Sequence, residues 1–187
     1  EIVTVKSNLE KLSVLNKTIT ACNINNEGIF DLSSTEITTY IGATKNYYPT
    51  YEDALNEVFA NEIIDFKNYT STNKKVFVLV KTKSGCKEIA EISLEFYPLP
   101  KLDFTKYQNV YCEETITINL KNITSQVLSN YTLFTVKYYS TQADAIAGNT
   151  STLPNTNSFT KDTTIYMRIE SENGCEPIIE LLSFKFG

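Results

Sequence analysis

The four cysteines have the clearest potential chemistry in this chain, because two thiols can be oxidised to a disulfide. They fall into two pairs of nearly equal spacing, since Cys86 follows Cys22 by 64 residues and Cys175 follows Cys112 by 63. Cysteines that only fill a core have no reason to recur as matched pairs, so the spacing predicts one disulfide within each pair. Four free buried thiols are the alternative. Disulfides would place the chain in an oxidising compartment outside the cytoplasm.

A metal site is a second kind of chemistry that the sequence could support. In NINNEGIFD (23–31), oxygen-bearing side chains alternate at Asn23, Asn25, Glu27 and Asp31, which is a spacing that can hold Ca²⁺. Asparagines stand where a strong site has carboxylates, and an Asn/Gly turn between two strands explains the same residues. We therefore expect no cofactor and keep calcium as the candidate metal. A zinc site is not expected, because the sequence lacks histidine and CxxC pairs.

Tyrosine rings could form a platform for a sugar, because each ring combines an apolar face with a polar tip. Tyr47–Tyr48 and Tyr138–Tyr139 sit within strand-like runs, where neighbouring side chains point to opposite faces of a sheet. One tyrosine of each pair should be in the core and the other exposed. Tyr48, Tyr51 and Tyr139 are the candidate ligand-binding residues, and ordinary packing is the alternative.

No set of residues predicts catalysis. Paired acids such as Glu52–Asp53 lie at expected helix starts, where carboxylates stabilise the helix dipole. A general base is also missing among the serines, because the chain has no histidine. We therefore predict that the protein is not an enzyme. Asp162–Thr163–Thr164 resembles a short O-glycosylation signal, which makes Thr163 a candidate modification site.

Charge and hydropathy exclude two classes of partner. The net charge is −5 and neither half of the chain is basic, so binding to nucleic acid is not expected. No apolar run approaches the roughly 20 residues of a membrane-spanning helix, so membrane insertion is not expected either. Because Glu1 begins in the strand-like run EIVTVK, we expect the chain to be a piece of a longer protein.

These residues are arranged in an internal repeat. YYPTYEDA (47–54) returns as YYSTQADA (138–145), and Gly85–Cys86 returns as Gly174–Cys175. The order of all matching features is kept, so the chain is a tandem duplication of about 90 residues, near the size of an immunoglobulin-like sandwich. The fold class that we predict is all-β, with two tandem immunoglobulin-like β-sandwich domains that each carry a short helical turn and one disulfide.

The predicted elements follow from short runs of β-branched and aromatic residues between Asn, Ser, Gly and Asp. Strands are expected near 17–22, 28–33, 43–49, 62–67, 74–83 and 88–97, and again near 106–112, 115–121, 132–140, 151–159, 162–171 and 177–186. Helical turns with threonine N-caps are expected at 50–57 and 141–148. The domains are then 1–14 (the end of a preceding repeat or a linker), 15–97 (repeat 1), 98–104 (a proline-containing linker) and 105–187 (repeat 2).

Each repeat contains a Cys, a Tyr-Tyr strand leading to Thr-x-x-Asp-Ala, and a Gly-Cys turn before the closing strand, and repeat 2 adds Ile-Tyr-x-Arg-Ile (165–169). This pattern resembles the immunoglobulin-like tandem repeats of large Bacteroidota cell-surface adhesins of the gliding-motility type, exported by the type IX secretion system. The resemblance covers about 15–187 and is most specific at 138–145 and 163–186. It implies secretion, display at the cell surface and a role in adhesion.

We therefore predict a non-catalytic extracellular module that acts as a stalk or spacer in a surface adhesin and takes part in adhesion. Its expected partners are neighbouring repeats of the same long chain, surface polysaccharide and the cell-surface machinery. The alternatives are a glycan-binding module and an accessory domain of a secreted hydrolase. Flanking sequence would separate the hydrolase from the other two, because it would contain a catalytic domain.

Overall fold

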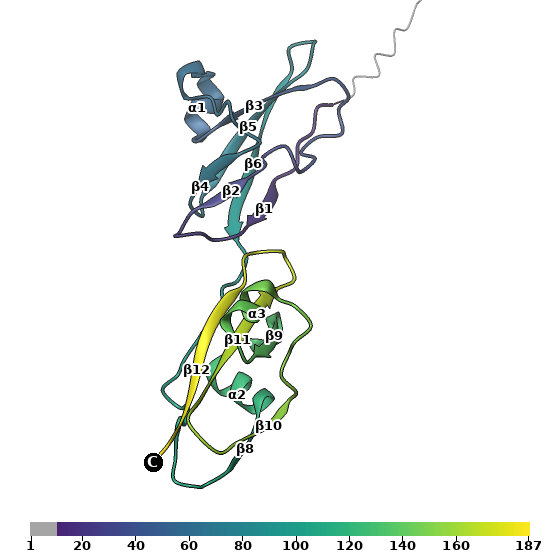
Figure 1. Cartoon of the computed structure of the whole chain (residues 1–187). Coiled ribbons are helices and arrows are strands. Elements are labelled where there is room, and N and C mark those ends of the chain that lie inside the picture. The colour runs from purple at the N-terminus through teal and green to yellow at the C-terminus, as the bar shows by residue number, and fades with distance from the viewer. Residues whose placement is uncertain (1–10) are drawn as a thin grey trace, which may run out of the picture. The chain divides into compact units, whose positions relative to one another are not determined.

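The computed structural model describes residues 11–187 and divides into two compact units (Figure 1). The first ends at Tyr97 and the second is Pro98–Gly187. The segment expected to be a linker, 98–104, belongs to the second unit, where Leu102 bridges to Leu128 and the amide of Lys101 donates to Asn130 Oδ1 at 2.9 Å. Most of the segment assigned to a preceding repeat (1–14) lies outside the described residues.

Each unit is a small immunoglobulin-like β-sandwich, which confirms the predicted fold class. In repeat 1 a four-stranded sheet of order β1-β6-β5-β3 faces the two-stranded β2-β4 (Figure 1). Its elements are β1 (Lys17–Ala21), β2 (Gly28–Phe30), β3 (Thr44–Tyr48), α1 (Tyr51–Asn56), η1 (Phe59–Asn61), β4 (Tyr69–Ser71), β5 (Lys75–Lys81) and β6 (Lys87–Phe96). The strand expected at 62–67 is wrong, since the strand that pairs with β2 is β4, a few residues later.

Repeat 2 repeats this plan with sheets of order β7-β12-β11-β9 and β10-β8. Its elements are β7 (Val110–Tyr111), β8 (Ile116–Asn119), α2 (Leu120–Val127), η2 (Tyr131–Leu133), β9 (Phe134–Tyr139), α3 (Gln142–Ala147), β10 (Thr156–Phe159), β11 (Thr163–Ser171) and β12 (Ile178–Phe186). The registers match as well, because Tyr48 pairs with Phe77 in repeat 1 and Tyr139 pairs with Tyr166 in repeat 2. The duplication in sequence is therefore a duplication in structure.

The first strand of each repeat is an edge strand that runs parallel to the last one. Lys17 to Ala21 of β1 pair with Ile92 to Phe96 of β6, so both strands end at the same edge of the sheet. In repeat 2, Val110 and Tyr111 of β7 pair with Lys185 and Phe186 at the end of β12. Each repeat is therefore entered at one end of the sandwich and left at the other.

Alternating apolar residues build a separate core in each repeat. In β5 and β6 of repeat 1, buried residues alternate with more exposed ones, as one face of each strand turns toward the opposite sheet. The repeat 1 core contains Phe30, Leu32, Ile37, Tyr47, Val76, Val78, Val80, Ala90, Ile92 and Leu94. In repeat 2, Phe184 is fully buried among the rings of Tyr107, Tyr111 and Phe159.

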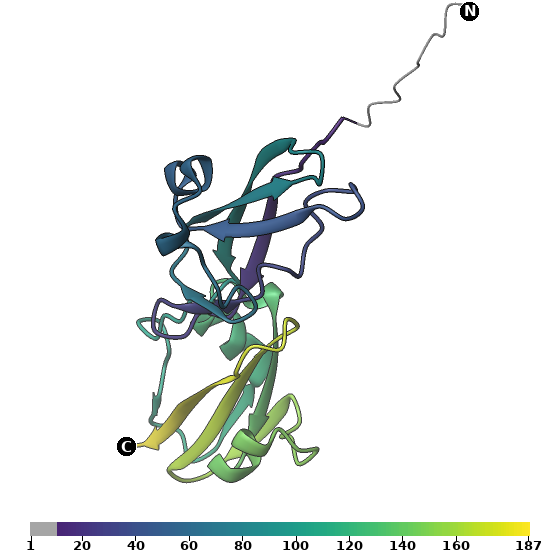
Figure 2. The same ribbon diagram turned by 90° about the horizontal axis from the view of Figure 1, so that it is seen from above.

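The predicted helical turns are present in both repeats and share one capping arrangement. Thr50 and Thr141 are the N-caps, and their hydroxyls accept hydrogen bonds from the backbone amides of Asp53 and Asp144. Figure 2 shows β3 leading directly into the coil of α1. Each helix ends at a residue with a left-handed backbone, which is Glu57 (φ 52°) in repeat 1 and Gly148 (φ 63°) in repeat 2.

Glu57 therefore takes a conformation that usually requires glycine, and its carboxylate is held by two lysines. Lys81 Nζ donates to it at 2.7 Å and Lys87 pairs with the other carboxylate oxygen. Hydrogen bonds from Lys81 and Lys87 lower the pKa of Glu57 from 4.5 to about 2.

We predict that the Glu57 pairs stabilise repeat 1 fully above pH 4.5, and that this contribution is lost as the pH falls toward 2, because the folded state keeps the carboxyl ionised. NMR titration should give a Glu57 midpoint near 2. Glu57→Gln should flatten the acid side of the stability curve, whereas Glu52→Gln, on the same helix and without an ion pair among the described residues, should not. An unchanged acid slope in Glu57→Gln would contradict the prediction.

Candidate functional site

The cysteines are not paired as the sequence predicted. Cys22 and Cys175 are disulfide-bonded, whereas Cys86 and Cys112 are free and exposed. Both predicted pairs, Cys22 with Cys86 and Cys112 with Cys175, are therefore wrong, because one member of each is a free thiol. Each repeat contributes one bonded and one free cysteine, and the bonded one is the first of its pair in repeat 1 and the second in repeat 2.

The parallel edge strand explains why the cysteines of one repeat cannot pair. Cys22 follows β1, whose last residue pairs with Phe96 at the end of β6, while Cys86 directly precedes Lys87 at the start of β6. Ten residues of strand at about 3.3 Å each separate the two levels by roughly 30 Å. A disulfide requires Cα atoms within about 7 Å.

The same separation holds in repeat 2. Cys112 follows β7 next to the end of β12, where the amide of Gly187 donates to Tyr111 O at 3.0 Å, and Cys175 lies in the turn before β12. In both repeats the first cysteine therefore lies where the chain leaves the sandwich. The second lies in the turn at the opposite end.

The residues at which repeat 2 begins lie beside the turn that carries its second cysteine. Pro98 lines a hollow of about 240 Å³ together with Ser171, Glu172 and Asn173, and Cys175 follows two residues later. In repeat 1, Asn16, just before β1, accepts a hydrogen bond from the amide of Glu91 midway along β6. Because β1 runs parallel to β6, the chain enters β1 from the side of the sheet on which β6 begins, directly after Cys86. The second cysteine therefore marks the entrance of a repeat, and the first cysteine marks its exit.

The tyrosine platform expected from the sequence is not formed. Tyr48 is 3% exposed and Tyr139 is 0% exposed, so both members of each Tyr-Tyr pair are buried. The reason is that the helical turn after each pair covers the second sheet face, where Ala54 packs with Tyr48. Tyr51 remains half exposed and packs edge-on against Phe77.

The proposed calcium loop is a turn whose side chains bond to its own backbone and neighbours. Asn23 Oδ1 accepts from the amide of Asn26 at 2.8 Å, and Asp31 Oδ1 accepts from Ser33. Asn25 and Glu27 are exposed. Within residues 11–187 no three His, Cys, Asp or Glu side chains gather in a way that could hold a metal ion. Calcium binding by this loop stays a prediction.

Thr163 is the first residue of β11 and its hydroxyl donates to Lys161 O at 2.8 Å. It is half-buried, and its glycosylation stays a prediction. Asp162 beside it accepts from the amide of Phe186 and pairs with Lys185. These two contacts of Asp162 hold the start of β11 to the end of β12.

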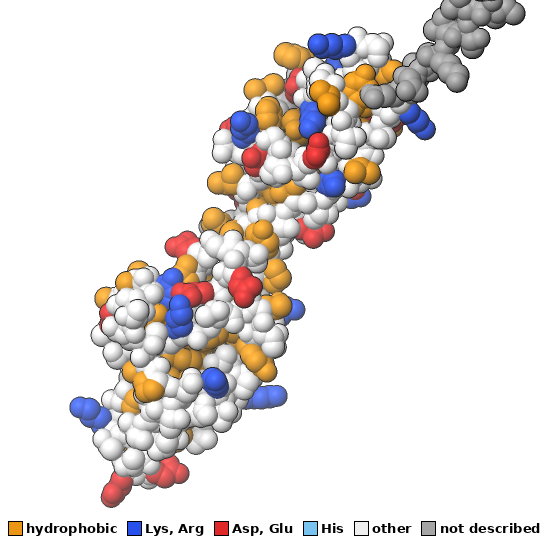
Figure 3. All heavy atoms as spheres, turned by 90° about the vertical axis from the view of Figure 1, so that its right-hand side faces the viewer, with side chains coloured by type: hydrophobic (Ala, Val, Ile, Leu, Met, Phe, Trp, Pro, Cys, Tyr) orange, Lys and Arg blue, Asp and Glu red, His pale blue; other side chains and the backbone are white. Residues whose placement is uncertain are grey.

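The surface of repeat 2 contains an open groove of about 480 Å³ beside β8 and α2. Its lining is rich in amides and hydroxyls, contains two tyrosines, and includes Tyr107, Gln108, Tyr111, Thr117, Asn122 and Gln126. Helix α2 was not predicted, although Leu120, Ile123 and Val127 have helical spacing, Asn119 caps the helix and all three apolar residues are buried. On the face seen in Figure 3, charges of both signs are interspersed.

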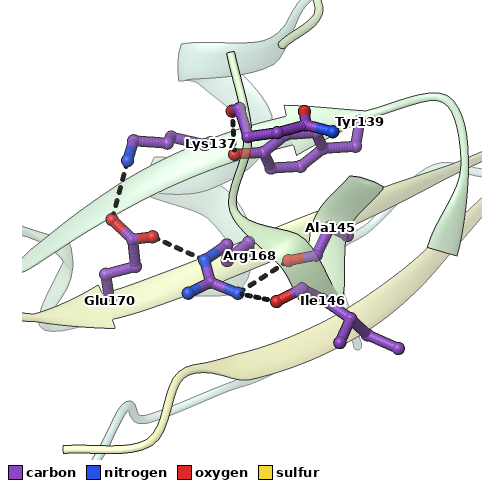
Figure 4. A network of polar contacts seen from close by, with 7 residues as sticks. Lys137, Tyr139, Ala145, Ile146, Arg168 and Glu170 are labelled. Atoms are coloured by element: carbon purple, nitrogen blue, oxygen red, sulfur yellow. Dashed lines mark hydrogen bonds and ion pairs between the residues drawn. The ribbon is translucent and has the colours of Figure 1, made fainter. Parts of the chain in front are cut away.

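Arg168, the only arginine of the chain, is used to hold the end of helix α3 (Figure 4). Its Nη1 donates to the carbonyls of Ala145 and Ile146 at 2.7 and 2.9 Å, and its Nε donates to Glu170 at 2.5 Å. Lys137 donates to the other oxygen of Glu170, and Arg168 and Lys137 together lower the pKa of that carboxyl. A side chain that could have bound an external anion is thus committed to the fold.

We predict that Arg168→Met destabilises repeat 2 by about 1.5–3 kcal/mol, because two helix-end carbonyls and a half-buried carboxylate lose a charged donor. Lys185→Met removes an ion pair whose lysine is 57% exposed and should cost at most about 1 kcal/mol. Denaturant unfolding of the two variants measures the difference. Equal losses would show that Arg168 contributes only a surface ion pair.

Comparison with known proteins gives one family and several solved structures, two of which are described below. The family model described as "Flavobacterium inter-domain disulphide bond domain" matches twice, at residues 18–100 and 108–184. No curated protein sequence matches. A crystal structure of Dpr11 IG1 bound to DIP-gamma IG+IG2 is 7% identical, with 94% of this chain and 98% of that chain aligned and a TM-score of 0.31. Sidekick-1 immunoglobulin domains 1–4 are 11% identical, with 94% of this chain and 47% of that chain aligned and a TM-score of 0.34.

Among the described residues no helix is long and apolar enough to cross a membrane.

Proposed function

Because this chain belongs to the family of Flavobacterium inter-domain disulphide bond domains, we propose that it is a non-catalytic segment of an extracellular bacterial protein in which a disulfide joins consecutive repeats. In this chain the bond joins Cys22 to Cys175. The family description, the free thiols of Cys86 and Cys112 and the bonded state of the other two cysteines support this pairing.

The position of the bonded cysteines within their own repeats carries the proposal. The amide of Tyr97 donates to Ala21 O at 3.0 Å, which places Cys22 at the exit of repeat 1. Pro98 lies beside the turn that leads to Cys175, at the entrance of repeat 2. Since Tyr97 and Pro98 are joined by a peptide bond, the exit of one repeat and the entrance of the next are tied covalently, and the two bonded cysteines are the ones at those ends.

The peptide chain and the disulfide together connect consecutive repeats at two points, and this limits how far the repeats can rotate relative to each other. The peptide chain alone would not limit that rotation. A stalk or spacer benefits from this restriction, because it keeps a distal adhesive part at a set distance. The resemblance to gliding-motility-type adhesins of the Bacteroidota supports surface display and export by the type IX secretion system. Disulfide chemistry supports an extracytoplasmic location. The proposed partners are neighbouring repeats and, through the parent protein, surface polysaccharide.

Peptide mapping without reduction tests the pairing. The full chain is produced in an oxidising compartment, its free thiols are alkylated, and its proteolytic peptides are analysed by mass spectrometry. We expect one cross-linked peptide pair that contains Cys22 and Cys175, with Cys86 and Cys112 alkylated. Cross-links within the repeats, or four alkylated cysteines, would overturn the proposal.

The groove of repeat 2 favours glycan binding as a second function. Its amides and hydroxyls can exchange hydrogen bonds with sugar hydroxyls, and the rings of Tyr107 and Tyr111 offer apolar surface. On a glycan array, Asn122→Ala with Gln126→Ala should abolish saturable binding by the chain. Tyr51→Ala, at the exposed tyrosine of repeat 1, should leave binding unchanged. If the unmodified chain binds no glycan on the array, the second function is wrong and only the spacer function remains.

A further inference from the structure

Cys86 and Cys112 remain unexplained by a bond between Cys22 and Cys175. Both are exposed free thiols. Cys86 is held in a tight turn, where its amide donates to Thr82 Oγ1 and its carbonyl accepts from the amide of Thr82, each at 3.0 Å. The turn therefore fixes the place at which the thiol is presented.

Each free cysteine has a bonded counterpart at the same position of the other repeat. Cys112 corresponds to Cys22, since each follows a first strand whose last carbonyl accepts from the residue after the closing strand: Tyr97 donates to Ala21 and Gly187 donates to Tyr111, both at 3.0 Å. Cys86 corresponds to Cys175, since each follows a glycine with positive φ in the turn before the closing strand. Free and bonded cysteines thus have the same local structure. They differ in whether a second repeat of this chain follows or precedes the end at which they lie.

We propose that Cys86 and Cys112 each form an inter-repeat disulfide of the same kind as Cys22–Cys175. Each of them bonds to a cysteine in a further copy of this repeat. Cys112, at the exit of repeat 2, bonds to the second cysteine of a following repeat. Cys86, at the entrance of repeat 1, bonds to the first cysteine of a preceding repeat. The inference rests on the proposed Cys22–Cys175 bond, and it makes a continuous chain of disulfides in which every repeat is bonded on both sides.

Formation of each bond is an ordinary thiol–disulfide exchange with a disulfide oxidant such as oxidised glutathione. The thiolate of Cys112 attacks the oxidant and forms a mixed disulfide, which releases one glutathione thiolate. The thiolate of the partner cysteine then displaces the second glutathione. The oxidant takes up two electrons, and the protons lost by the two protein thiols are taken up by the two glutathione thiolates. Both exposed thiols are accessible to the oxidant.

A fusion of two copies of the chain tests the proposal, with Gly187 of the first copy joined to Lys11 of the second. In the junction variant, Cys86→Ser in the first copy and Cys112→Ser in the second leave one extra thiol on each side of the new joint. In the mirror variant the two substitutions are exchanged, so the extra thiols lie at the two outer ends. Both proteins have the same composition and both keep Cys22 and Cys175 in each copy.

After oxidation in a glutathione buffer and isolation of the monomer, we expect the junction variant to lose at least about 90% of its free thiol and to yield a peptide pair linking Cys112 to Cys86. The mirror variant should keep two free thiols per molecule. Equal free thiol in both variants, with Cys22–Cys175 formed in each copy, overturns this inference and leaves the proposed function standing. Absence of Cys22–Cys175 from both variants overturns the proposed function itself.

Discussion

Cys175→Ser, a substitution in repeat 2, should lower the stability of repeat 1 by about 4 kcal/mol. With Cys22 bonded to Cys175, an unfolded repeat 1 stays attached to folded repeat 2 at both ends and forms a closed loop of about 75 residues, which costs about 4 kcal/mol of chain entropy. The substitution opens that loop and lets the unfolded repeat gain the entropy. Hydrogen exchange of the β5 amides in repeat 1 should accelerate by about a thousandfold.

Cys112→Ser is the matched control, since it removes a thiol from the same repeat that is free in the structure. It should leave hydrogen exchange in repeat 1 unchanged. If Cys112 and Cys175 were bonded to each other, both substitutions would destabilise repeat 2 and neither would affect repeat 1. The location of the effect therefore distinguishes the two pairings without any peptide mapping.

Phe184→Ala should destabilise repeat 2 by about 3–5 kcal/mol, the usual range for removing a fully buried phenylalanine. Phe184 is 0% exposed, its ring stacks on Phe159 at 5.1 Å between centroids, and Tyr107 and Tyr111 approach to 6.1 and 6.4 Å. The small side chain would leave a cavity that the three surrounding rings cannot close. Denaturant unfolding followed by tyrosine fluorescence measures the loss.

Leu181→Ala on the same strand tests whether burial is the cause, because Leu181 is 57% exposed. It should change the free energy of unfolding by no more than about 0.5 kcal/mol. Repeat 1 should keep its stability in both variants, since the repeats have separate cores. A similar loss in both variants would mean that β12 is sensitive to any shortened side chain.

Much of the fold could be predicted because the same sequence patterns occur in both repeats, so each weak pattern is supported by a second copy. Alternating apolar residues in 75–81 and 163–171, and Thr-x-x-Asp at 50 and 141, appear twice in the same order, so strands and capped turns were placed nearly where they lie. Helix α2 was missed because it has no counterpart in repeat 1. Its apolar residues at 120, 123 and 127 follow directly on a strand, and the run continues without a break.

The cysteine pairing could not be predicted because alternation along a strand carries no information on strand direction. A first strand that runs antiparallel or parallel to the last strand has the same pattern of buried residues, yet the two arrangements place Cys22 at opposite ends of the sheet. The matched spacing of the pairs is a repeated feature of the structure. The spacing shows that each repeat has cysteines at the same two positions. It does not show whether the cysteine that bonds to each of them lies in the same repeat or in another one.

Parallel pairing of the edge strands has a consequence for a protein under tension. With Cys22 and Cys175 joined as proposed, a pulling force that enters at Lys17 runs along β1 to Cys22, crosses the disulfide, and leaves along β12 from Ile178 to Phe186. The load follows covalent bonds lengthwise through each repeat and bypasses the remaining strands. After reduction the same force shears β1 from β6, where the load falls on the five residue pairs from Lys17 to Ala21. The redox state thereby decides whether the sandwiches themselves carry the load.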